Sequence, residues 1–262
     1  MNYVRKILTG SLILAASASL AACQTASSVS DDAKLDSVMA QAAAHAQMQG
    51  QTQQSLAMLE QLYKRNSSDP DVALKYAHAL RQNGYANRAA LILGPFVKDK
   101  DLDNAALAIE YASIQAAMGN YTESENAARK AVLLAPESGK AYHVLGIALD
   151  AQGFHEPAHT AFEKGLNYWQ GDPSPILNNL GLNLAAQGFL DEAIETLRKA
   201  LDTAPNRREI ERNLRIVSAL QYQPPVEGMR LVPKPPRKPD LTLTAVPVVE
   251  VEADNTEEND AE

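Results

Sequence analysis

Cysteine and aromatic residues are scarce in this chain, and their scarcity excludes several classes of structure and chemistry. Cys23 is the only cysteine among 262 residues, so the chain can form no intramolecular disulfide and no cysteine-rich metal site. Aromatic side chains make up only 5% of the residues. The strands of a β-sandwich favour β-branched and aromatic residues, whereas alanine-rich chains with few aromatics favour closely packed helices. The composition therefore indicates an all-α protein.

Clusters of positive charge are also missing. The chain carries a formal net charge of −8, with 32 acidic residues against 24 lysines and arginines. An acidic chain without a basic cluster argues against nucleic acid and anionic lipid headgroups as partners. The sequence also contains no Ser/His/Asp constellation and no glycine loop of the kind that binds phosphate. We therefore expect a protein that is not an enzyme, binds no nucleic acid and needs no cofactor.

The N-terminal residues have the pattern of a targeting segment. Arg5 and Lys6 precede an apolar run over residues 7–20. This run is shorter than the about 20 apolar residues that a transmembrane helix needs. It ends in Leu20-Ala21-Ala22-Cys23, which resembles the lipobox of bacterial lipoproteins. In that family the signal peptide is cut before the cysteine, and the cysteine carries the lipid.

The lipobox resemblance implies a membrane anchor. It divides the N-terminal region into a signal peptide over residues 1–22 and a lipidated tether over residues 23–35, with Cys23 as the lipidated residue. Several acyl chains at one point suffice for stable anchoring. Gln24, rather than aspartate, follows the cysteine, and by resemblance to the lipoprotein sorting pattern this implies an outer-membrane protein that faces the periplasm. The alternative is an ordinary secretory signal followed by an unmodified cysteine.

Three columns of small residues repeat along the chain with a period near 34 residues. Glycines recur at intervals of 34, 35, 34 and 35 residues, at Gly50, Gly84, Gly119, Gly153 and Gly188. Small residues follow these glycines by five positions, at Ser55, Ala89, Ser124, Ala158 and Ala193. Others precede them by seven positions, at Ala43, Ala77, Ala112, Gly146 and Gly181. This pattern predicts pairs of closely packed helices, each with a left-handed glycine between its two helices.

The columns resemble the tetratricopeptide repeat (TPR) pattern of about 34 residues per helix-turn-helix. One copy has its apolar, small and turn residues at the expected offsets: Leu177, Leu180, Gly181, Leu184, Gly188, Ala193, Leu197, Ala200 and Pro205. The resemblance implies an all-α TPR superhelical solenoid of about five helix pairs within residues 36–222. The predicted repeats are 36–69, 70–104, 105–138, 139–173 and 174–207, followed by a capping helix over 208–221. Leu214, Val217 and Leu220 are expected to face inward from this cap.

The composition changes after the predicted cap. Half of the chain's 14 prolines fall between Pro224 and Pro247, and the last residues are acidic. We therefore expect residues 223–262 to form a Pro-rich, acidic, disordered tail. Leu241 to Val251 alternates like a strand that could add to a partner's sheet edge, although an unstructured tail is the favoured interpretation.

One catalytic motif requires a test against the repeat. His155-Glu156-Pro157-Ala158-His159 matches the H-E-x-x-H sequence of zinc proteases. That chemistry needs both histidines on one continuous helix, with the glutamate beside a metal-bound water. The repeat register instead places His155 in the turn after Gly153, and Pro157 in the first turn of the next helix. We therefore expect no metal site and interpret the match as a coincidence of turn sequence.

The concave face of a TPR array is the usual binding surface, and helix A positions 2, 5, 6, 9 and 12 line it. The candidate groove residues are Lys75, His78, Arg81, Glu110, Lys140, His143, Ile147, Asn178, Asn179 and Leu182. Asparagine suits an extended peptide because its amide pairs with a backbone N–H and a C=O. We therefore expect replacement of Asn178 and Asn179 by alanine to weaken partner capture. The alternative for each residue is an ordinary solvated face. The Lys/Asn set of carboxylate-clamp TPRs, which hold a chaperone's C-terminus, is not reproduced.

The lipobox, the repeats and the tail together resemble TPR lipoproteins of pilus and secretion systems. The combination is most similar to TadD-like proteins of tight-adherence (Flp) pilus assembly, and it is also similar to type IV pilus pilotins. The resemblance implies a non-enzymatic, outer-membrane-anchored scaffold whose partners are a secretin, pilus-assembly proteins or extended peptide segments. The alternatives are an adaptor for cell-wall enzymes or outer-membrane protein assembly and, from another class, the H-E-x-x-H protease.

Overall fold

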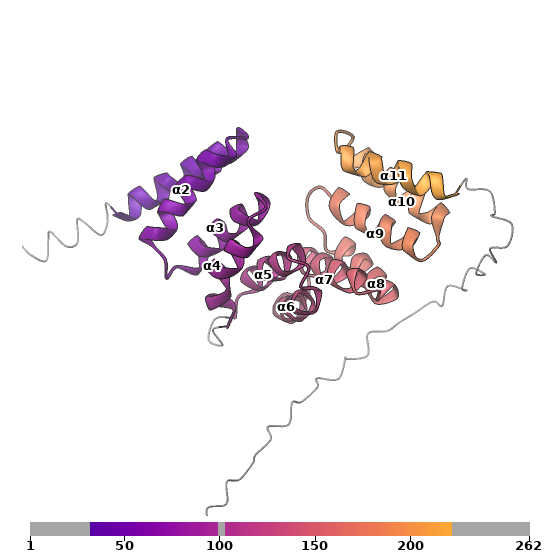
Figure 1. Ribbon diagram of the computed structural model, residues 1–262, viewed down its shortest axis with the longest axis horizontal. Coiled ribbons are helices and arrows are strands. Elements are labelled where there is room, and N and C mark those ends of the chain that lie inside the picture. Colours follow the sequence, from indigo (N-terminus) through magenta and orange to yellow (C-terminus); the bar gives the residue numbers. More distant parts are fainter. Residues whose placement is uncertain (1–31, 99–102, 222–262) are drawn as a thin grey trace, which may run out of the picture. The chain divides into compact units, whose positions relative to one another are not determined.

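The computed structural model describes residues 32–98 and 103–221 (Figure 1). Within these ranges the only regular elements are helices. The predicted signal peptide, Cys23 and the predicted tail over 223–262 lie outside the described residues. The predicted tether over 23–35 overlaps them only in its last four residues.

The helices follow one another in pairs. The first pair joins a helix that covers residues 32–48 to α2 (Thr52–Arg65). The remaining helices are α3 (Pro70–Gln82), α4 (Ala86–Lys98), α5 (Ala105–Ala117), α6 (Tyr121–Leu134), α7 (Gly139–Ala151), α8 (His155–Asn167), α9 (Ser174–Ala186), α10 (Leu190–Thr203) and α11 (Arg208–Gln221). We call the first helix of each pair helix A and the second helix B. The predicted all-α solenoid of helix pairs with a final capping helix is confirmed.

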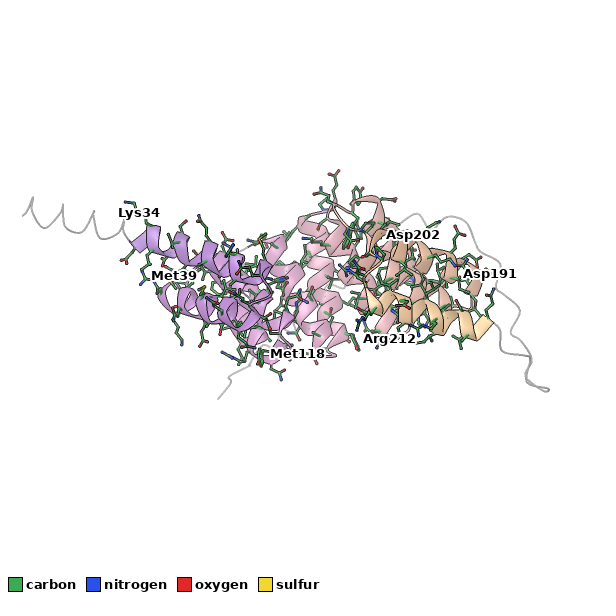
Figure 2. The ribbon with its side chains drawn as sticks, turned by 90° about the horizontal axis from the view of Figure 1, so that it is seen from above. Lys34, Met39, Met118, Asp191, Asp202 and Arg212 are labelled. Carbon is green, nitrogen blue, oxygen red and sulfur yellow. The ribbon has the colours of Figure 1, made fainter. Side chains whose placement is uncertain are left out.

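The A helices form a continuous row. Each helix from α2 onward packs on the next one along the chain, and α3, α5, α7, α9 and α11 also contact one another in sequence. In Figure 2 the side chains of Lys34 and Met39 project from the first helix, and Arg212 lies on the last. Because each pair buries its open face on its neighbour, equivalent helix A positions recur side by side along one surface.

The turn between helix A and helix B is set by the repeating glycine. Gly84 has a φ of +80°, a left-handed conformation that residues with a Cβ adopt at a cost. The Gly84 N–H donates to the Arg81 carbonyl at 3.0 Å, and the Tyr85 N–H donates to the Leu80 carbonyl at 2.9 Å. This pair of bonds is the Schellman motif, which satisfies the last carbonyls of a helix. The same two bonds recur at Gly50, Gly119, Gly153 and Gly188, as the glycine column predicts.

The two other columns bring helix A and helix B into close contact. A Cβ added to Gly181 would lie 2.7 Å from the Leu197 side chain of α10, which leaves no room for one. The serines of the second column add a bond to the close contact. The Ser55 and Ser124 hydroxyls donate to the carbonyls of Ala43 and Ala112, each at 2.8 Å. The small residues therefore set the distance between the paired helices.

Two predicted details differ in the structure. Residues 32–35, assigned to the tether, are helical. Because these residues belong to the first helix, Asp32 lies one helical turn before Asp36. Arg65 of α2 forms ion pairs with both carboxylates, at 2.9 and 2.8 Å. In α11, Leu220 is 48% exposed rather than inward. Ile210, seven residues before Val217 and on the same helix face, is buried instead.

Within the ranges that the structure describes, no helix combines the length and the apolar character needed to cross a membrane.

Candidate functional site

A groove of about 930 Å³ runs along the row of A helices. Its lining residues come from the helix over 32–48, from α3, α5 and α7, and from the start of α9, with Leu59 and Trp169 added from outside the A helices. The A-helix lining consists of Ser37, Ala40, Gln41, Ala44, Gln47, Leu74, Lys75, His78, Arg81, Ala106, Ile109, Glu110, Ser113, Ala116, Lys140, His143, Val144, Ile147 and Pro175.

The lining follows the repeat register. Leu74, Ile109 and His143 are each the fifth residue of their A helix, and all three line the groove. The ninth residues, which lie one helical turn later, also line it. Because the A helices stand side by side, these recurring positions form rows across the solenoid. In α3, α5 and α7 every lining residue falls at one of the helix A positions 2, 5, 6, 9 and 12.

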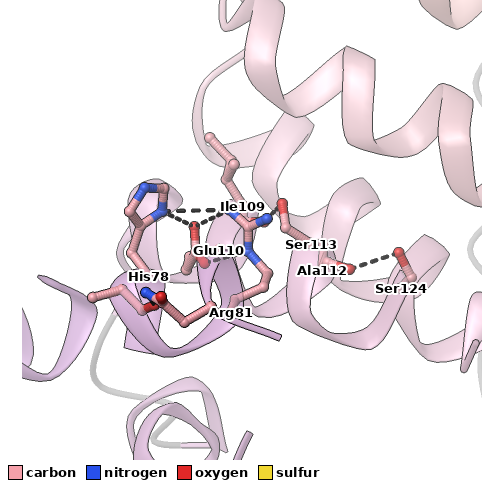
Figure 3. Close-up of polar contacts among 9 residues, drawn as sticks. His78, Arg81, Ile109, Glu110, Ala112, Ser113 and Ser124 are labelled. Carbon is pink, nitrogen blue, oxygen red and sulfur yellow. Dashed lines mark hydrogen bonds and ion pairs between the residues drawn. The ribbon is translucent and has the colours of Figure 1, made fainter. Parts of the chain in front are cut away.

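An ionic cluster joins α3 to α5 inside the groove (Figure 3). The Arg81 guanidinium donates from Nε to Glu110 Oε1 at 2.6 Å and from Nη2 to Oε2 at 3.2 Å. His78 Nδ1 lies 2.9 Å from Glu110 Oε2. Because a carboxylate can only accept, we place the proton of His78 on Nδ1. Glu110 thus receives a two-point contact from arginine and a third bond from histidine.

The cluster keeps Glu110 charged. Only 7% of this residue is exposed, and burial alone would raise the pKa of its carboxyl group. The hydrogen bonds from His78 and Arg81 and the positive charge of Arg81 outweigh burial, so the pKa of Glu110 lies below its usual value. The negative charge of Glu110 and the positive charge of Arg81 therefore offset each other within the groove.

His143 is the neutral counterpart of this cluster on α7. The Asn179 side-chain amide donates to His143 Nε2 at 2.8 Å, and the rings of Trp169 and His143 form a T-shaped contact with 5.2 Å between their centroids. Burial lowers the pKa of His143 to about 4, so the ring is neutral at pH 7. With Nε2 accepting, Nδ1 carries the proton and offers one N–H donor.

Most of the predicted groove residues come together, but three do not. Lys75, His78, Arg81, Glu110, Lys140, His143 and Ile147 line the groove. Asn178, Asn179 and Leu182 are absent from the lining. Asn178 is only 6% exposed and accepts a hydrogen bond from Asn213 of α11 at 2.9 Å, while the amide of Asn179 is bonded to His143. Contacts with neighbouring A helices therefore occupy both amides that we expected to bind a peptide.

Two kinds of lining residue escaped the sequence analysis. Ser113 is the ninth residue of α5 and Ala40 is the fifth residue of the predicted repeat 36–69, so the register alone could have identified both. Trp169 lies in the connection after α8, and its position follows from no register rule. Its indole N–H donates to the Asp172 carbonyl at 2.7 Å, which fixes the ring at the edge of the groove.

The H-E-x-x-H sequence lies at the start of α8. His155 is the first residue of this helix rather than part of the turn, because the Schellman motif already closes at Phe154. The two histidines have different partners: His155 is hydrogen-bonded to Asp150 at 2.7 Å, and His159 Nδ1 lies 3.6 Å from the Glu163 carboxylate. Among residues 32–98 and 103–221, no group of three or more His, Cys, Asp or Glu side chains could hold a metal ion.

Two segments of the chain match known protein families. Residues 101–138 and residues 176–204 each match a tetratricopeptide repeat family. Among curated proteins, nothing matches the chain.

Solved structures share the fold. A thermophilic TPR protein from Thermus thermophilus is 17% identical, with a TM-score of 0.62 over 70% of this chain and 99% of the other. A chain of the APC/C hetero-tetramer Cut9–Hcn1 is 12% identical, with a TM-score of 0.65 over 72% of this chain and 37% of the other. MamA from Desulfovibrio magneticus RS-1 is 18% identical, with a TM-score of 0.51 over 66% and 96%. At these identities the likeness shows the fold alone. The repeating glycine turns, the row of A helices and the two matched repeats together show that this chain has a tetratricopeptide repeat fold.

Proposed function

We propose that this protein is a lipid-anchored scaffold of the bacterial outer membrane that holds partner proteins during assembly of a pilus or secretion apparatus. The observation that carries the proposal is the groove along the A helices, which is long, continuous and lined by both polar and apolar side chains. Tetratricopeptide repeat proteins act in general as non-enzymatic scaffolds for protein–protein interaction. An extended segment of a partner suits a groove of this shape.

The membrane part of the proposal rests on sequence. Leu20-Ala21-Ala22-Cys23 resembles a lipobox, and Gln24 fits the pattern of outer-membrane sorting. A chain anchored this way would keep its groove in the periplasm, where secretin subunits and pilus-assembly proteins pass on their way to the outer membrane. Flp pilus assembly is the proposed system because TadD-like proteins combine the same lipobox, repeats and tail.

The anchor is tested by labelling the source bacterium with a palmitate analogue and separating its two membranes. The native chain is expected to carry the label and to fractionate with the outer membrane. Cys23→Ser is expected to remove both label and membrane association, and Gln24→Asp to move the labelled chain to the inner membrane. A labelled Cys23→Ser chain would show that this cysteine is not the lipid attachment site.

The assembly role is tested by deleting the gene and restoring it with either the native chain or Cys23→Ser. The native chain should restore surface pili and the secretin in the outer membrane, whereas the unanchored chain should restore neither. Normal pili in the deletion strain would overturn the pilus role, and the scaffold would then belong to another envelope system.

A further inference from the structure

The groove has a charge opposite to that of the chain. Its charged lining residues are Lys75, Arg81, Lys140 and Glu110, whereas the whole chain carries −8. Arg81 and Glu110 are bonded to each other. Lys75 and Lys140 are exposed, and neither forms an ion pair with another of the residues that the structure describes. The two ammonium groups, from α3 and α7, therefore give the groove its net positive charge.

Apolar side chains line the groove on the two helices that carry the lysines and on α5. Leu74 of α3, Ile109 of α5 and Ile147 of α7 are partly buried and line the groove on successive A helices. Trp169 adds an aromatic ring next to His143 of α7. A partly buried apolar row of this kind can gain hydrophobic contact area when an occupant covers it.

We propose that the groove binds an extended apolar segment of a partner protein that carries acidic side chains, whose carboxylates pair with Lys75 and Lys140. The inference rests on the proposed scaffold function and adds the chemistry of the partner. The apolar row takes the partner's hydrophobic side chains, and the lysines take its charges. The His78–Arg81–Glu110 cluster does not compete for those charges, because its carboxylate and guanidinium are already paired.

A test can use the chain's own fluorescence. Trp169 is the only tryptophan and lies in the groove, so its emission reports on occupancy of this site. The full-length chain in detergent is titrated with three synthetic peptides in which leucine alternates with glutamate, glutamine or lysine. The glutamate peptide should shift the Trp169 emission and bind about two- to thirtyfold more tightly than the glutamine peptide, which is the range expected for two exposed ion pairs. Added salt should reduce the difference.

The lysine peptide makes the test decisive. The net charge of the chain favours this cationic peptide, whereas the groove disfavours it. Tighter binding of the lysine peptide, equal binding of the glutamate and glutamine peptides, or no emission change with any peptide would each overturn the inference.

A pair of variants locates the effect. Lys75→Gln with Lys140→Gln should remove the preference for glutamate over glutamine. Lys164→Gln with Lys199→Gln removes the same charge from α8 and α10, outside the groove lining, and should leave the preference intact. Circular dichroism checks that both variants fold. Equal losses in the two variants would contradict the assignment of the carboxylate contacts to Lys75 and Lys140.

Failure of this inference is distinguishable from failure of the proposed function. If deletion of the gene abolishes pili but the chain shows no preference for the glutamate peptide, only the proposed partner chemistry is overturned. A clear glutamate preference in a chain whose deletion leaves pili and the secretin unchanged overturns only the assembly role.

Discussion

Neighbouring A helices are joined by an ion pair in the N-terminal half of the solenoid and by hydrogen bonds from asparagine amides in the C-terminal half. Between α3 and α5 the link is the bidentate Arg81–Glu110 pair with His78 beside it. Between α7 and α9 it consists of the Asn179 amide, which donates to the neutral His143, and the Asn183 amide, which donates to Asp150 at 2.7 Å. Between α9 and α11 it is Asn213 on Asn178. All three links join residues about one repeat apart, so the same register serves both chemistries.

The comparison shows how a neighbouring helix can bury a helix A position that would otherwise line the groove. His78 retains a partly exposed ring and lines the groove, although it is bonded to Glu110. Asn178 occupies the fifth position of α9, equivalent to His143, but the cap α11 buries it. A helix A position therefore lines the groove only where the following A helix leaves it accessible. The link through Glu110 should weaken in acid and when glutamine replaces the glutamate. The link between Asn179 and His143 should weaken when His143 is protonated.

Acidification should have the largest effect on the stability of the fold, because it protonates His143. The pKa of His143 is about 4 when folded and about 6.5 when unfolded, so between these values the unfolded chain binds more protons. The contribution of neutral His143 to the free energy of unfolding is therefore fully present above pH 6.5. It falls by about 3 kcal/mol as the pH drops towards 4. Thermal unfolding measured across this range should show the loss in the native chain. His143→Gln should remove most of this pH dependence, whereas His45→Gln, an exposed control on the first helix, should retain it.

The next largest effect should come from closing the gap between paired helices. Gly181→Leu places a side chain where a Cβ alone would lie 2.7 Å from Leu197, and overpacking of this kind costs about 1–3 kcal/mol or more. Chemical unfolding followed by circular dichroism measures the loss. Ala186→Leu, at an exposed site of the same helix, is the matched control and should cost little. Equal stability of the two variants would mean that the helices tolerate a wider spacing.

Neutralising the charged link should have an intermediate effect. Glu110→Gln keeps the shape but loses the charge that holds Arg81 and His78, which should cost about 2 kcal/mol at pH 7. Because the folded pKa of Glu110 lies below its usual value, this contribution is present above that usual value and lost as the pH falls through the folded pKa. The stability difference between native chain and variant should therefore shrink in acid. A constant difference would mean that the carboxylate charge is not what stabilises the contact.

The smallest effect should come from the neutral link of the cap. Asn178→Ala deletes the hydrogen bond from Asn213 and the longer one to Asn179, and should cost about 1 kcal/mol. Because Asn178 lies outside the groove lining, peptide binding followed by Trp169 emission should not change. This outcome differs from the weakened capture that the sequence suggested. Loss of peptide binding in a stably folded Asn178→Ala chain would restore this residue to the binding surface.

The sequence predicts the fold well because the fold depends on local steric rules. A left-handed turn calls for glycine at Gly84, and close helix contact calls for a small residue at Gly181, so both leave a periodic trace. The groove positions follow from the same period. The burial of Asn178 does not, because it depends on how α11 packs. The place of Trp169 depends on the path of a connecting segment that has no periodic pattern.

The central claim is that partners bind in the groove along the A helices. Site-specific photo-crosslinking in the source bacterium tests it most directly, with the photoreactive group placed at Ile109 in the groove or at Leu133 on α6. Leu133 is 83% exposed and lies outside the groove lining, so it controls for accessibility. We expect a discrete partner adduct from Ile109 and none from Leu133. An adduct from Leu133 alone, or the same adduct from both positions, would contradict the claim.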